Sequence, residues 1–166
     1  MTPDPLILLV AALIPFVFAT IWFSKSLFGG ENWARIAGLT PEQAAKKPKP
    51  AKMLLTILLN FFVALGLYSL CVHQSGVFSL VGGDATLLKS GTGAAFMAEY
   101  GGNFLTVKHG LFHGFLASLC FALPVLGYVT IFEHKSAKYF WVYQGYWTIC
   151  MMLMGAVICQ WGATAV

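Results

Sequence analysis

The chain has 166 residues, of which 58% are hydrophobic and 10% are charged. Soluble domains carry about 45–50% apolar and about 25% charged residues, so this composition excludes an ordinary soluble enzyme. The length suits one domain, and the mean hydropathy of +0.77 indicates a small integral membrane protein.

Four stretches are apolar over the roughly 20 residues that a membrane-spanning helix needs. They are residues 5–23, 53–72, 107–132 and 140–161. The sequence therefore predicts an all-α four-helix bundle that forms one transmembrane domain over residues 1–166. The segment before the first stretch has no Lys or Arg, so we expect a retained helix and not a cleaved signal peptide.

The basic residues predict the orientation of the chain. Eight of the ten Lys and Arg lie in or beside the first and third loops. They are Lys25, Arg35, Lys46, Lys47, Lys49, Lys52, Lys135 and Lys138. The positive-inside rule places these loops in the cytoplasm and both termini outside. Residues 24–52 then form the inner loop and residues 73–106 form a long outer loop.

The inner loop contains a helix signal followed by a run of lysines. Thr40, Pro41 and Gln43 are spaced as a capping box with proline at the first helical position, which predicts a short helix. Lys46, Lys47, Lys49 and Lys52 follow it, and each cation near a membrane gains about 1 kcal/mol from anionic lipid. This run is a topology anchor or a binding site for anionic lipid or a phosphate-bearing partner.

The outer loop is rich in glycine and too long to be an ordinary connection. We expect it to fold back over the outer end of the bundle, with one short helix near residues 93–100.

The most polar group in a span opens the third stretch. His109 and His113 are four residues apart, which places both imidazoles on one helical face. His73 and Glu99 are expected at a similar depth, and Lys108 lies beside the pair. The alternatives are structural hydrogen bonding, proton or solute handling, and ligation of a metal or haem.

Small residues in the same stretch indicate close helix packing. Gly110, Gly114 and Ser118 recur every four residues, the spacing that lets a second helix approach. That helix belongs either to this chain or to a second copy.

Further polar residues also lie in the spans. Asn60, in the middle of the second span, is expected to bond across the bundle or to line a solute path. Gln144 and Gln160 are interpreted as interfacial anchors. The four cysteines are interpreted as free apolar packing residues.

Two motifs resemble a known family. Trp22-Phe23-Ser24, then Phe28-Gly29 and Trp33, is similar to the opening signature of domain-of-unknown-function family 1761, a family of bacterial and fungal membrane proteins. The segment from Gly145-Tyr146-Trp147 to Trp161 is similar to the family's last helix. The resemblance implies a compact helical membrane protein and supplies no activity, cofactor or catalytic residue.

Three functional hypotheses follow from these observations. The leading one is a non-enzymatic multi-pass protein of the bacterial inner membrane that acts through helix packing, as an oligomer or as a subunit of an assembly. The second is a small transporter or channel that uses Asn60, Lys108, His109 and His113. The third is a metal- or haem-binding membrane protein that uses the histidines. No cofactor is required by the sequence, and no nucleic-acid partner is expected.

Overall fold

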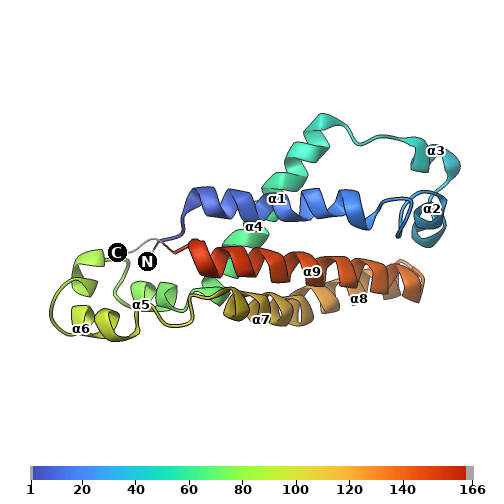
Figure 1. The fold of residues 1–166 in the computed structure, drawn as a ribbon. Helices are drawn as coiled ribbons and strands as arrows, with labels where there is room; N and C mark the ends of the chain where they lie inside the picture. The colour runs from blue at the N-terminus through green and yellow to red at the C-terminus, as the bar shows by residue number, and fades with distance from the viewer. Residues whose placement is uncertain (1, 164–166) are drawn as a thin grey trace.

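The computed structural model describes residues 2–163, and every regular element in that range is a helix. Four segments are long and apolar enough to cross a membrane. They are Pro5–Trp22 (α1), Pro50–Cys71 (α4), Val107–Phe132 and Ala137–Trp161 (α9). The predicted four-helix membrane fold is therefore confirmed, and Figure 1 shows α4 crossing α1 obliquely beside the other spans.

Helix α9 is the central element of the bundle. Half of the residues in its apolar stretch are buried, against 22% in the corresponding stretch of α1 and 28% in that of α4. Helix α9 contacts α1, α4, α7 and α8. The core between α1, α4 and α9 is built from small and aliphatic residues. Its buried members include Leu8, Ala11, Ala64, Leu67, Met154 and Ile158.

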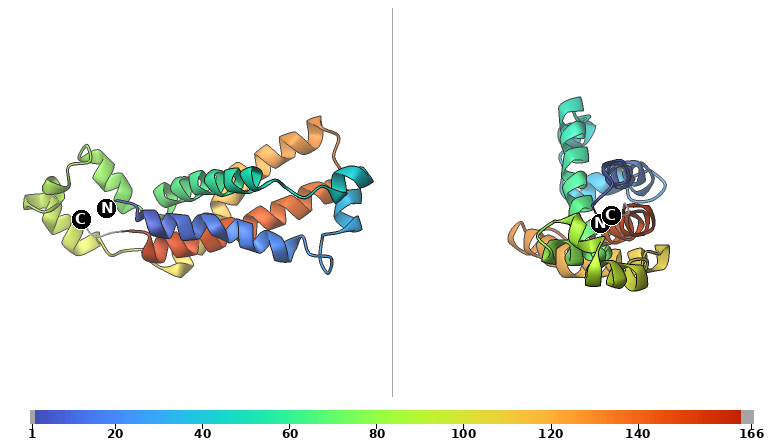
Figure 2. Two further views of the ribbon diagram at one scale, coloured as in Figure 1. Left: turned by 90° about the horizontal axis from the view of Figure 1, so that it is seen from above. Right: turned by 90° about the vertical axis from the view of Figure 1, so that its left-hand side faces the viewer.

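The third span is not one regular α-helix. It consists of α7 (Val107–Ala117), a π-helical turn η2 (Ser118–Ala122) and α8 (Leu123–Phe132). Pro124 has no N–H for the carbonyl of Cys120, and its ring clashes there in a regular helix. The wider π turn accommodates this conflict just before the proline. Beyond it, α8 leans away from α4 and α9 (Figure 2).

Residues 24–49 contain two short helices, α2 (Glu31–Ala37) and α3 (Pro41–Ala45). The predicted capping box is present in α3. The Thr40 hydroxyl accepts from the Gln43 N–H at 3.3 Å, and the Gln43 carbonyl oxygen accepts from the Thr40 N–H at 2.8 Å. Helix α3 was predicted from the sequence, whereas α2 was not.

Residues 73–106 are also more ordered than the sequence suggested. The predicted short helix is α6 (Gly91–Tyr100). The segment contains in addition α5 (Gln74–Leu80) and the 3₁₀ helix η1 (Ala85–Leu88), neither of which was predicted.

The two ends of the bundle differ in what they carry. Pro3 pairs with Ala163, and the Asp4 N–H donates to the Gly162 carbonyl at 2.9 Å. The start of α1, the end of α9 and residues 73–106 therefore share one end, while α2 and α3 lie at the other (Figure 1). We name these the terminal end and the basic end, because eight of the ten Lys and Arg lie in or beside the loops of the second.

Candidate metal centre

Three of the four histidines of the chain meet at the terminal end. His73 lies between α4 and α5, while His109 and His113 lie one turn apart on α7. A ring nitrogen from each lies within 4.8 Å of the other two, and the Nε2 atoms of His73 and His109 are 3.0 Å apart. The structure therefore brings together the three histidines that the sequence analysis singled out. We name them the His cluster.

Local structure determines where each imidazole lies. Thr106 caps α7 by accepting from the His109 N–H at 3.3 Å, which fixes the first turn of that helix. Helical spacing then places His113 directly above His109, with ring centroids 4.3 Å apart. His73 follows the last residue of α4 by two positions, so it reaches the cluster from the neighbouring helix.

The ring of Phe104 forms one wall of the His cluster. It lies 6.1 Å from the His73 ring and 5.1 Å from the His109 ring, measured between centroids. Phe104 has a φ of 64°, a left-handed conformation that bulky residues rarely adopt. Such backbone persists where the surroundings hold it, and it is common at functional sites.

Two buried side chains hold the turn that carries Phe104. Gln74 donates through Nε2 to the carbonyls of Gly101 and Asn103, at 3.1 and 2.8 Å. The Cys159 thiol donates to the Phe104 carbonyl at 3.1 Å. These bonds hold the turn that places the Phe104 ring beside the His cluster. Gln74 was not predicted as part of the site, because only the folded turn shows which carbonyls its amide bonds.

A small cavity adjoins the His cluster on the α5–α6 side. Its volume is about 230 Å³, and its lining is mostly apolar. The lining residues are His73, Gln74, Val77, Phe96, Tyr100, Asn103 and Phe104. The cavity gives water or a small molecule room beside the His73 ring.

The two carboxylates of residues 73–106, Glu99 and Asp84, are not part of the His cluster. Glu99 is exposed on α6, and its side chain hydrogen-bonds Tyr100, which raises the pKa of that phenol. Asp84 accepts from the Thr86 hydroxyl at 2.6 Å and the Thr86 N–H at 2.9 Å, and these bonds lower its pKa. Lys108 is exposed on the first turn of α7. Within the described residues, the converging group consists of the three imidazoles alone.

The glycines of α7 pack inside the chain. A Cβ at Gly110 would collide with the backbone of Gly155, and a Cβ at Gly114 would collide with the backbone of Met151. Both partners belong to α9, so the small-residue face of α7 is covered by a helix of the same chain. This contact also fixes the helix that presents His109 and His113.

Ser118 lies in a buried polar group between η2 and α9. Its hydroxyl is 2.7 Å from the Thr148 hydroxyl and accepts from Gln144 Nε2 at 2.8 Å. The interpretation of Gln144 as an interfacial anchor is wrong, since its side chain is 4% exposed and faces η2. Gln160 does lie at the helix end, where its side-chain oxygen accepts from the Val107 N–H at 3.1 Å.

Asn60 is buried among the helices near the middle of α4, at 3% exposure. Its Nδ2 has no hydrogen-bond partner among the described residues. Asn60 lies apart from the His cluster, because His73 follows the C-terminal end of α4.

The opening motif residues form an aromatic cluster at the basic end. Trp22 donates through Nε1 to the Val142 carbonyl at 3.1 Å, which ties the end of α1 to α9. Phe23 lies 4.9 Å from Trp33 between ring centroids. Phe28 lies 4.9 Å from Trp22. Glycine is required at position 29, where a Cβ would collide with the Phe23 carbonyl.

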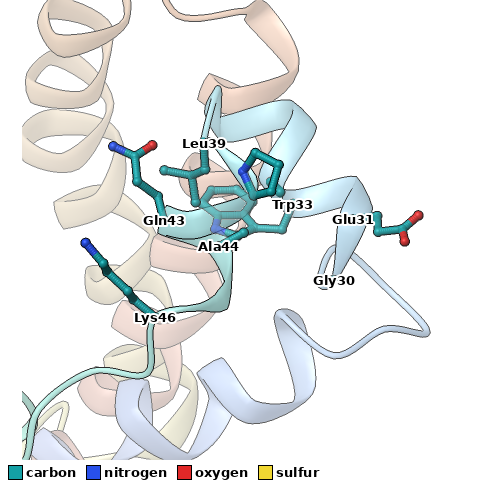
Figure 3. A pocket seen from close by; sticks show the side chains of 9 residues that line it. Gly30, Glu31, Trp33, Leu39, Gln43, Ala44 and Lys46 are labelled. Carbon is teal, nitrogen blue, oxygen red and sulfur yellow. The ribbon is translucent and has the colours of Figure 1, made fainter.

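A second cavity lies beside this cluster, between α2 and α3. Its volume is about 760 Å³, and Figure 3 shows the Trp33 ring lying among its lining side chains. We name it the basic-end cavity. It is lined by Gly30, Glu31, Trp33, Ala34, Leu39, Pro41, Gln43, Ala44 and Lys46.

Together these features define a multi-pass helical membrane protein with a three-histidine cluster at one end. Residues 6–159 match the family model described as "Protein of unknown function (DUF1761)". The chain therefore belongs to the DUF1761 family, as the motifs around Trp22 and Trp33 indicated. No curated protein and no solved structure matches this chain.

Proposed function

We propose that this protein binds one divalent transition-metal ion through His73, His109 and His113. The convergence of three imidazole nitrogens within 4.8 Å carries the proposal. A hydrogen bond between His73 and His109 accounts for two of these nitrogens, whereas one bound ion accounts for all three.

The donor set favours Zn²⁺ or a neighbouring metal such as Cu²⁺ or Ni²⁺. Imidazole nitrogen suits these ions and is a poor ligand for Ca²⁺ or Mg²⁺. Zinc–nitrogen bonds of about 2.0–2.1 Å in a tetrahedral site separate the nitrogens by about 3.3 Å. The 3.0 Å between His73 and His109 is close to that spacing. Three protein ligands leave the fourth position to water or a small ligand, as in catalytic zinc sites.

The same geometry disfavours haem. A porphyrin fills four positions around its iron and leaves two axial ones. Three histidine nitrogens within 4.8 Å of one another suit a single bare ion better.

The leading hypothesis from the sequence, action through oligomer or assembly contacts, loses its main support. Gly110 and Gly114 pack against α9 of the same chain. The transport hypothesis depends on Asn60 and on the polar start of α7, which lie apart. Between them, the side chains of Ser118, Thr148 and Gln144 hydrogen-bond one another across η2 and α9. Metal binding is therefore the function that the geometry supports best.

We also propose a location for the site. The basic residues predict that the terminal end faces away from the cytoplasm, and we place the chain in a bacterial inner membrane. The His cluster would then lie at the outer surface of that membrane, where it would take metal from the periplasm.

Calorimetric titration of the purified, metal-free protein with Zn²⁺ tests the proposal. We expect one bound ion per chain. Changes one shell away from a metal cost about 10–100-fold in affinity, so His109→Ala and His113→Ala should each cost more than about 100-fold.

The matched control is His134→Asn. His134 is the remaining histidine and lies at the other end, with a φ of 52° that asparagine tolerates. Its zinc affinity should equal that of the unchanged protein. Equal affinities in all three variants would contradict the proposal.

A further inference from the structure

The basic-end cavity combines an apolar floor with a cationic edge. Figure 3 shows Leu39 and Ala44 close to the Trp33 ring, with the side chains of Gln43 and Lys46 extending to the same side. Glu31 lies on the opposite side of Trp33 in that view. The acidic residue of the lining is therefore separated from the lysine.

The chain around the cavity has an excess of unpaired cations. Residues 31–52 carry five Lys and Arg against two Glu. The four lysines from Lys46 to Lys52 are all exposed. The ion pair found in the described part of the chain is Lys135–Glu133, at 3.9 Å, so these four lysines have no carboxylate partner there.

The start of α4 adds to the positive potential. A helix N-terminus carries a partial positive charge, and cations in the first turn are unfavourable. Lys49 is the N-cap of α4, makes no side-chain capping bond, and is followed by Lys52. A bound anion would offset this repulsion.

The lysines lie beside the bundle and close to apolar helix surface. After α3, the chain runs back along the side of the bundle to α4 (Figure 1). The first turns of α4 then expose Leu54, Leu55 and Leu58 at 69%, 52% and 51%. The aromatic rings of Trp33, Tyr139 and Tyr143 contact one another at the same end, and such rings are enriched where headgroups meet hydrocarbon.

We propose that the basic-end cavity binds the phosphate-bearing headgroup of an anionic phospholipid. Lys46 and Gln43 contact the headgroup. Lys47, Lys49 and Lys52 add positive charge along the segment that leads from the cavity to α4, and the acyl chains lie toward the exposed leucines of α4. The adjacent apolar surface favours a lipid over free phosphate, since free phosphate makes no use of it. This site is independent of the His cluster.

Native mass spectrometry of the full-length protein in detergent tests the proposal. The protein is offered equal amounts of phosphatidylglycerol and phosphatidylcholine, and retained lipids are counted. We expect retention of phosphatidylglycerol in preference to phosphatidylcholine. Equal retention of the two lipids would overturn the proposal.

Two pairs of variants separate the cavity from general surface charge. Lys46→Gln with Lys47→Gln should lower the preference about fivefold per lysine, whereas Lys135→Gln with Lys138→Gln removes equal charge elsewhere at the same end and should leave it unchanged. Ala44→Trp fills the cavity without altering charge and should also abolish the preference. Ala45→Trp, at a neighbouring position that does not line the cavity, should retain it.

The remaining outcomes are equally decisive. If Ala44→Trp retains phosphatidylglycerol as well as Ala45→Trp does, the lipid binds outside the cavity and the proposal is wrong. If millimolar inorganic phosphate displaces the lipid from the unchanged protein, the site is one for free phosphate and the lipid assignment is wrong.

Discussion

At the residue scale, the sequence predicted those parts of the site that depend on local spacing. His109 and His113 share a face because they are four residues apart on a helix. His73 was placed by its position just after an apolar span. Gln74 and Phe104 were not predicted, because their roles depend on a turn in which Phe104 is left-handed. Glu99 was grouped with the histidines but is not one of the residues that meet there, since sequence distance alone does not fix the direction of α6.

The buried group of Ser118, Gln144 and Thr148 gives a prediction at this scale. Ser118→Ala removes one hydrogen-bonding hydroxyl between η2 and α9. Interhelical hydrogen bonds in membrane proteins contribute about 0.6–1.7 kcal/mol, so the free energy of unfolding should fall by about 1 kcal/mol. Unfolding in mixed detergent micelles measures this change.

Ser79→Ala is the control for that measurement. The Ser79 hydroxyl bonds only one turn back along its own exposed helix, to the Ser75 carbonyl at 2.9 Å. A loss in Ser118→Ala no larger than that in Ser79→Ala would show that the buried group adds no stability.

At the element scale, apolar length and capping signals predicted most of the helices. Thr40, Pro41 and Gln43 predicted α3 because a capping box is defined by residue types within four consecutive positions. The π turn was not predicted, since Pro124 marks a conflict without showing how the chain resolves it. Helices α2 and α5 were missed because each is a short element of seven residues with little periodicity to detect.

The contact between α7 and α9 gives the prediction at this scale. In Gly114→Ala the new methyl group would collide with the Met151 backbone, and overpacking of this kind costs about 1–3 kcal/mol. The unfolding free energy should fall by that amount, and zinc affinity should fall with it because α7 carries two of the ligands.

Gly66→Ala is the matched control on α4. No atom lies within 4 Å of the position where its Cβ would be, and alanine is favoured over glycine in a helix by about 1 kcal/mol. This variant should be as stable as the unchanged protein or slightly more so. If both variants have the same stability, α7 and α9 do not pack as closely as described.

At the scale of the whole molecule, composition predicted the fold class and charge predicted the two ends. The 58% hydrophobic content leaves the lipid-facing sides of α1, α4 and α8 apolar, while the basic loops gather at one end. The cavities were beyond prediction, because each forms between short helices whose relative placement has no sequence signal. The central claim is that the His cluster, at the terminal end of the bundle, holds a metal ion.

X-ray absorption spectroscopy of the zinc-loaded protein tests that claim most directly. The account predicts three imidazole nitrogens at about 2.0–2.1 Å, one oxygen ligand from water, and no sulfur. A shell made only of oxygen, or one with fewer than three imidazoles, would contradict it.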